Sequence, residues 1–142
     1  MTGGMDYDEF EKLTKNFQKL VNDYDKFVDD FLKTEGNKCL ANTIENTPVN
    51  PINGGRLKGG WRLAGPFKRA GNIRYVIIHN PVKYAIWVED GHRIVNQYGV
   101  DTGRWKKGVH MARIALAETE LKLDSRFRTQ FNKFCKDRGV GQ

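Results

Sequence analysis

Residues 10–31, FEKLTKNFQKLVNDYDKFVDDF, decide the fold, because large apolar side chains recur along them at alternating steps of three and four residues. That spacing places the side chains on one stripe of an α-helix. Val21, Val28 and Leu32 widen the stripe to the width of a core-facing helix. We predict a helix from about Asp6 to Asn46, which Gly36 could split in two. The stripe consists of Phe10, Leu13, Phe17, Leu20, Tyr24, Phe27 and Phe31.

Two kinds of packing would bury this stripe. Three heptads fit a coiled coil, and the same residues also fit a single helix lying on a sheet. Packing against a sheet is favoured, because a coiled coil normally needs a longer repeat. The acidic residues Asp8, Glu9 and Glu11 suit the positive end of the helix dipole, and Asp6 or Asp8 is a good N-cap.

Turn signals separate short apolar segments after this helix. Thr47-Pro48 ends it, because the residue before a proline is disfavoured in the α region. Residues 47–60 are rich in glycine, asparagine and proline, and we predict a flexible loop there. Strands are predicted at 61–64 and at 73–79, where β-branched and aromatic residues dominate, and Ala70-Gly71-Asn72 forms a tight turn between them.

The second half of the chain returns to a helix. Residues 83–91 fit a short helix that ends at Gly91 with positive φ, although alternation also allows a strand. A strand follows near 92–95, and a second exposed loop is predicted at 96–108. A C-terminal helical region spans 109–136 and could break at Leu123-Asp124-Ser125.

This order of elements predicts one α+β domain over residues 1–142. A small antiparallel β-sheet, formed within residues 61–107 together with the short helix, packs against the long N-terminal helix and the C-terminal helix. The apolar residues of the C-terminal helix that face this core are Met111, Ile114, Ala117 and Leu121.

The charge is unevenly distributed along the chain. The net charge is +7, yet residues 46–88 contain no acid. Such a segment makes a positive surface that attracts an anionic partner, either DNA or an acidic protein face. Its bases are Arg56, Lys58, Arg62, Lys68, Arg69, Arg74 and Lys83.

The motifs of most enzyme and cofactor classes are missing. Glu89-Asp90-Gly91-His92 is the one cluster that suggests acid–base catalysis, but no second histidine or serine motif accompanies it. No His/Cys spacing fits a metal, and no phosphate-binding loop is complete, so we predict neither enzyme activity nor a metal or cofactor. Nothing resembles a secretory signal or a membrane span. Cys39 and Cys135 are expected to be reduced thiols, with a disulfide between the terminal helices as the alternative.

Three separate elements carry a resemblance to a known family. They are Asn46-Thr-Pro-Val49 followed by Gly55-Arg-Leu57 and Trp61-Arg62; Asn80 to Arg93, which contains Tyr84-Ala-Ile-Trp-Val-Glu89-Asp-Gly91-His92-Arg93; and Gly108-Val-His-Met111-Ala. Their order and spacing resemble the tail-completion, or head–tail joining, proteins of long-tailed bacteriophages. The chain departs from that pattern in two places: residues 50–54 lengthen the first connection, and Met111 replaces an aromatic residue.

The resemblance implies a structural role in the virion. Such a protein is made in the cytoplasm of the host bacterium and forms a homo-oligomeric ring, six-fold by family resemblance, at the head-proximal end of the tail tube. Its partners would be the tail terminator or tube protein, the head connector or adaptor, and the genomic DNA that passes through the lumen. The alternatives are the tail terminator itself and a basic DNA-binding accessory module.

The resemblance and the loops together nominate residues for assembly contacts. Aromatic side chains commonly anchor such contacts, so the three tryptophans are included. The predicted interface residues are Arg56, Leu57, Trp61, Arg62, Tyr84, Trp87, Glu89, Gly91, His92, Arg93 and Trp105, and the predicted basic surface is Lys58, Lys68, Arg69 and Arg74.

Overall fold

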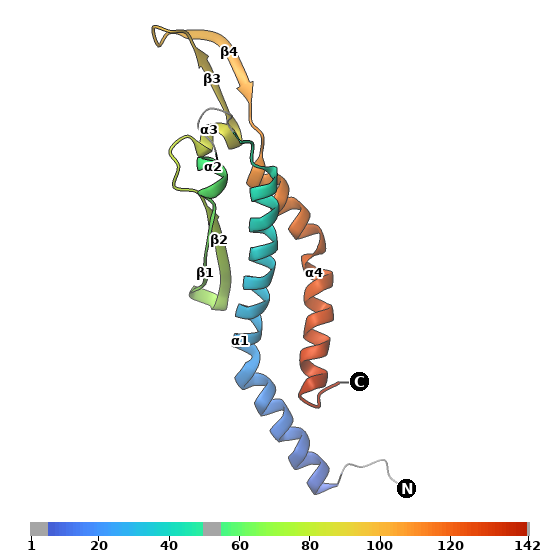
Figure 1. Cartoon of the computed structure of the whole chain (residues 1–142). Coiled ribbons are helices and arrows are strands. Elements are labelled where there is room, and N and C mark those ends of the chain that lie inside the picture. Colours follow the sequence, from blue (N-terminus) through green and yellow to red (C-terminus); the bar gives the residue numbers. More distant parts are fainter. Residues whose placement is uncertain (1–5, 50–54, 142) are drawn as a thin grey trace.

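The computed structural model describes residues 6–49 and 55–141 (Figure 1). Two long helices lie side by side, a β-hairpin covers another side of the first helix, and a second hairpin projects from one end. The elements are α1 (Tyr7–Asn46), α2 (Arg56–Gly59), β1 (Arg62–Arg69), η1 (Ala70–Asn72), β2 (Ile73–His79), α3 (Ala85–Asp90), β3 (Gly91–Val95), β4 (Asp101–Lys107) and α4 (Met111–Asp137).

The predicted α+β class is confirmed, with one change in its sheet. The strands form two separate antiparallel pairs, β1–β2 and β3–β4, where the sequence predicted a single sheet. The predicted strand at 73–79 and the predicted turn at 70–72 are β2 and η1. The first strand is longer than predicted, because β1 continues to Arg69 through an irregularity between Ala64 and Phe67.

Helix α1 runs unbroken past Gly36, so the predicted split is wrong. Asp6 is its N-cap and accepts a hydrogen bond from the Glu9 backbone N–H at 2.7 Å. Gly36 is buried beneath the β1–β2 hairpin, and a Cβ there would lie 2.9 Å from Leu63 Cδ1 and 3.1 Å from Val76 Cγ2. This glycine therefore brings the hairpin close to the helix instead of breaking the helix.

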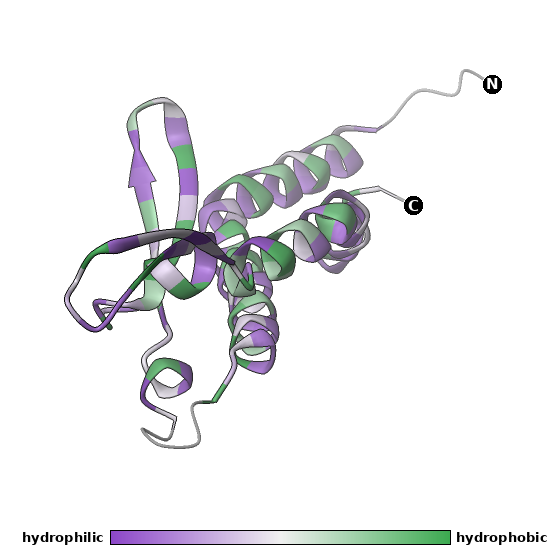
Figure 2. Cartoon of the chain, turned by 90° about the horizontal axis from the view of Figure 1, so that it is seen from above, coloured by the Kyte–Doolittle hydropathy of each residue, from purple (hydrophilic) through white to green (hydrophobic). Residues whose placement is uncertain are grey.

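Aromatic residues of the α1 stripe pack against α4. Phe27 meets Phe134 with ring centroids 4.5 Å apart, and Phe31 meets Phe127 at 5.2 Å. The β1–β2 hairpin contacts α1 at residues outside that stripe, such as Gly36 and Asp29. The ring contacts of the stripe are made with a helix, whereas the sequence predicted packing on a sheet. Helix α4 is continuous, and the break predicted at Leu123–Ser125 does not occur. Along both long helices, hydrophobic and hydrophilic segments alternate (Figure 2), as expected for amphipathic helices.

A compact core lies where the C-terminal end of α1 meets α2, α3 and α4. Leu57, Trp61, Ala85 and Met111 are buried there. The Trp61 indole Nε1 donates a hydrogen bond to the Thr47 hydroxyl at 2.8 Å, and Thr47 donates to the Thr43 carbonyl at 2.6 Å. The end of α1 is thus fixed by Trp61, the second residue after α2.

Two segments that were predicted as loops contain regular secondary structure. Residues 47–60 include the helical turn α2, which places Leu57 in the core. Residues 50–54 of that loop lie outside the described residues, so the predicted flexibility of these five residues stays a prediction. Residues 96–108 contain strand β4, which pairs with β3 from Gly91↔Lys107 to Val95↔Asp101.

Candidate assembly surface

The junction between α3 and β3 matches the prediction made from Gly91. Helix α3 ends at this glycine, whose φ is 93°. A Cβ at Gly91 would collide with the Lys106 carbonyl oxygen and would lie 2.9 Å from the Gly108 backbone nitrogen. Only a residue without a side chain lets β3 leave the helix at this angle and pair with β4.

Glu89 connects this junction to α4. Its Oε2 accepts a hydrogen bond from the Ala112 N–H at 3.0 Å, and its Oε1 accepts one from the Arg113 N–H at 2.9 Å. Its backbone carbonyl accepts a third bond, from His110 N–H at 3.1 Å. The carboxylate thus satisfies free N–H groups at the start of α4 and lies at the positive end of that helix.

The same cluster offers little for acid–base chemistry. Both Glu89 oxygens are engaged by backbone donors, and Asp90 pairs with Arg113 at 3.0 Å. His92 Nδ1 lies 2.8 Å from the carbonyl oxygen of Arg93. These contacts give the motif a structural task, which is to hold the base of the β3–β4 hairpin against α4.

The β3–β4 hairpin projects from the end of the molecule (Figure 1). Every residue from Arg93 to Lys107 is exposed, including large apolar side chains. Tyr98 is 81% exposed, Trp105 and Val100 are each 58% exposed, and Val95 is 55% exposed. The Asn96 side chain shapes the turn by accepting bonds from the N–H groups of Tyr98 and Val100 at 2.9 and 3.0 Å.

The predicted interface residues divide into buried and exposed groups. Leu57 and Trp61 are 5% and 7% exposed, so their side chains serve the chain's own core and leave little surface for a neighbour. Trp87 and Trp105 are both 58% exposed. At the hairpin base Leu57, Tyr84, Trp87 and His92 come together around one shallow pocket of about 440 Å³.

The predicted basic surface is not one continuous patch. Lys58 lies on α2, whereas Lys68 and Arg69 are the last two residues of β1, so six strand residues at about 3.3 Å each separate them. Arg74 faces α1, and its Nη1 donates to both carboxylate oxygens of Asp29, at 3.0 Å each. Arg62 is held by the carbonyls of Gly59 and Trp61 at 2.6 and 2.8 Å.

The exposed bases of the β3–β4 hairpin were not included in that surface. Arg104, Lys106 and Lys107 extend from β4, and Arg93 pairs with Asp101 across the hairpin at 3.1 Å. The sequence contained a signal for them, since three bases occur within four residues at 104–107. Because that segment was predicted as a loop, its side chains could not be placed on one element.

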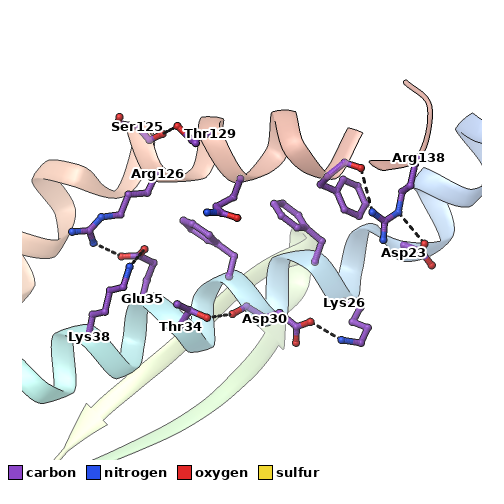
Figure 3. A pocket seen from close by; sticks show the side chains of 14 residues that line it. Asp23, Lys26, Asp30, Thr34, Glu35, Lys38, Ser125, Arg126, Thr129 and Arg138 are labelled. Atoms are coloured by element: carbon purple, nitrogen blue, oxygen red, sulfur yellow. Dashed lines mark hydrogen bonds and ion pairs between the residues drawn. The ribbon is translucent and has the colours of Figure 1, made fainter. Parts of the chain in front are cut away.

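A cavity of about 630 Å³ between α1 and α4 is lined by ion pairs that connect the two helices (Figure 3). Glu35 is buried, and its Oε2 accepts from Arg126 at 2.6 Å, while Lys38 lies 3.5 Å from Oε1. At the other end Arg138 donates to Asp23 at 2.9 Å. These pairs fix the register of α4 on α1, and the cavity is accordingly part of the scaffold.

Three further features bear on the class of protein. Within residues 6–49 and 55–141, no group of three or more His, Cys, Asp and Glu side chains is arranged to hold a metal ion. Over the same ranges, no helix combines the length and apolar character that a membrane span requires. Cys39 and Cys135 are free thiols, the first of them buried.

Comparison with known proteins identifies the family. The sequence profile described as "Bacteriophage HK97-gp10, putative tail-component" matches residues 11–91, more than half of the chain. No curated protein sequence matches the chain. No solved structure matches it either. The matched region runs from the stripe of α1 to Gly91 and includes the Glu89 motif, and the chain therefore belongs to the HK97 gp10-like family of bacteriophage tail components, which are structural proteins and not enzymes.

Proposed function

We propose that this tail component forms a homo-oligomeric ring at the head-proximal end of the tail tube and docks the tube to the head connector. The observation that carries the proposal is the β3–β4 hairpin, which projects from the body with aromatic and aliphatic side chains in solvent. Exposed apolar surface of this kind marks a site of protein association.

The hairpin gains from a partner in two ways. A two-stranded hairpin is at best marginally stable alone, and within the described part of the chain β3 and β4 pair only with each other. Both outer edges therefore offer unpaired backbone groups that another chain can extend, and the exposed Trp105 and Tyr98 supply side-chain anchors. Docking would bury these groups and order the hairpin.

A ring follows when such a contact joins two different surfaces. The hairpin is on one end of an elongated molecule, and a head-to-tail contact between unlike surfaces closes into a ring when the rotation allows it. Six subunits are proposed from the family resemblance alone. A ring between the tail tube and the head connector would lie in the neck of the virion.

The other partners follow from the position in the particle. One face of the ring would meet the tail terminator or tube protein, and the other would meet the connector or adaptor of the head. Genomic DNA would pass through the lumen, and exposed bases such as Arg56 and Lys68 suit a surface along which an anionic polymer moves.

Negative-stain images of the purified protein, alone and mixed with tail tubes, test the proposal. We expect rings, either free or on one end of each tube. Tyr98→Asp combined with Val100→Asp should abolish them, whereas the matched control Leu121→Asp, at an 85% exposed site on α4, should not.

The same samples separate the alternatives. Rings that shorten tubes when added during tube growth would favour the tail terminator. Monomers that bind duplex DNA with an affinity falling steeply with salt would favour the DNA-binding accessory module, because such a dependence reports released counterions.

A further inference from the structure

An apolar groove with an acidic rim lies between α1, β2 and α4. Its volume is about 720 Å³. Val28 and Leu32 of α1 and Leu123 of α4 form its apolar wall, and each of them is half-buried. The aromatic rings of Tyr24 and Phe127 complete the lining. These side chains leave apolar surface that a neighbouring element could cover.

Carboxylates surround this apolar surface. Asp25, Glu120 and Asp124 line the groove and are exposed, with 75% of the Asp25 side chain and 80% of the Asp124 side chain accessible. Arg74 also lines the groove, but Asp25 and Asp29 already pair with it at 3.3 and 3.0 Å. Asp124 contacts Arg128 at 3.2 Å, a solvent-exposed pair that contributes little. The rim therefore keeps a negative field.

The β3–β4 hairpin is the complement of this groove. Its turn presents Tyr98 and Val100, and its strands carry four bases, Arg93, Arg104, Lys106 and Lys107, against one acid, Asp101. Arg104 and Lys106 point to the same face of β4, because side chains alternate along a strand. The hairpin thus combines an apolar tip with basic flanks, and the groove combines an apolar floor with acidic flanks.

The hairpin cannot reach the groove of its own chain. Its base lies around the same pocket as Pro48 and Val49, just beyond the C-terminal end of α1, whereas the groove lies at residues 24–32 of α1. At 1.5 Å per helical residue, the groove lies about 20 to 35 Å from the end of α1 along the helix, and the hairpin points away from the groove (Figure 1). An occupant of matching shape and charge must therefore come from another molecule.

We propose that the β3–β4 hairpin of one copy docks into the α1–β2–α4 groove of the next copy, and that this contact is the repeating joint of the ring. The proposal rests on the proposed function. The two surfaces differ, so the contact is head-to-tail, and each subunit uses both of them once in a closed ring. Opposite charges orient the hairpin, and burial of Tyr98 and Val100 on the groove floor supplies the apolar part of the contact.

Charge reversal provides a direct test. Glu120→Lys with Asp124→Lys reverses the rim, and Arg104→Glu with Lys106→Glu reverses the hairpin; all four side chains are exposed, so both variants should fold. Each variant alone should lose ring formation, and its self-association in sedimentation velocity should be weaker by at least about tenfold. Mixed together, they should recover rings of 1:1 composition, because each hairpin again faces a rim of opposite charge.

The recovery cannot come from overall attraction. The chain has a net charge of +7, and each variant changes it by four units, so both partners in the mixture remain positive. Recovery in the mixture therefore requires the specific pairing of hairpin and rim. Rings formed by either variant alone at the wild-type concentration would overturn the proposal.

A cross-linking experiment gives a second measurement that does not depend on charge. In a Cys135→Ser background, Tyr98→Cys protein mixed with Leu123→Cys protein should give a 1:1 covalent dimer with a short bismaleimide, and neither protein alone should do so. A Tyr98→Cys homodimer would show a symmetric hairpin-to-hairpin contact and would overturn the proposal. Two results separate this joint from the proposed function: wild-type protein that forms no ring, free or on tubes, rejects the proposed function, whereas rings formed by both the wild type and the rim-reversed variant reject only this joint.

Discussion

The carboxylate of Glu89 caps helix α4 from outside that helix, with its Oε2 3.0 Å from the backbone nitrogen of Ala112. The residue at the N-cap position of α4, His110, has φ 55° and, in the described part of the chain, makes no side-chain capping bond. Glu89 thus takes the place of the ordinary cap and joins the base of the β3–β4 hairpin to the second long helix. The Glu89-Asp90-Gly91-His92 motif, which was considered for acid–base catalysis from the sequence, holds the hairpin base against α4.

Replacement of Glu89 by alanine should therefore lower stability. The change removes two hydrogen bonds and a charge that favours the helix N-terminus, and we expect a loss of about 1–2 kcal/mol. Thermal melts followed by circular dichroism would measure it. Glu118→Ala, on the exposed side of the same helix, is the matched control and should change stability by less than about 0.5 kcal/mol. Equal melts for the two variants would contradict the capping role.

Gly91→Val should destabilise the fold by more than about 1 kcal/mol. The residue has φ 93°, and a Cβ there collides with the Lys106 carbonyl. Urea denaturation would give the free energy of unfolding. Gly59→Ala is the control, since the described residues leave open space around a Cβ at that position. A Gly91→Val protein as stable as the control would reject the strained-backbone explanation.

We expect the hydrogen bond between Trp61 and Thr47 to stabilise the core. Trp61→Phe keeps most of the buried ring but leaves the Thr47 hydroxyl without its donor, and we expect a loss of about 1–3 kcal/mol. Thr47→Val removes the acceptor and should lose a similar amount. The double variant should lose less than the sum of the two single losses, because the shared hydrogen bond is lost only once. Strict additivity in the denaturation data would show that the bond contributes nothing.

The buried Glu35 depends on Arg126. Arg126→Met leaves that carboxylate with Lys38 at 3.5 Å, and we expect a loss of about 1–3 kcal/mol, because 34% of the Arg126 side chain is exposed and water partly replaces it. Glu35→Met with Arg126→Met should be more stable than Arg126→Met alone, since no buried unpaired charge then remains and Lys38 is 53% exposed to water. Chemical denaturation of both variants would decide, and the reverse order would contradict this view of the α1–α4 contact.

The sequence was sufficient for the parts of the fold that local periodicity determines. The stripe from Phe10 to Phe31 predicts α1, the segment Ile73–His79 predicts β2, and Gly91 predicts the end of α3. In each case neighbouring residues carry the information, through helical spacing, β-branched side chains or the need for positive φ.

The features that were missed depend on contacts distant in sequence. Strand β4 has a polar sequence without a β-branched run, and it is a strand because β3 pairs with it. Gly36 was expected to interrupt α1, but its lack of a side chain serves the approach of Leu63. Trp61 was predicted as a contact for a neighbour, and its burial follows from the position of α2, which no local pattern indicated.

We propose that this tail component joins heads to tails by assembling with itself. Deletion of its gene from the encoding phage, followed by electron microscopy of the lysate, tests this claim most directly. We expect DNA-filled heads and separate tails, with joining restored by the wild-type gene and not by the Tyr98→Asp, Val100→Asp variant. Whole, infectious virions from the deletion phage would contradict the account.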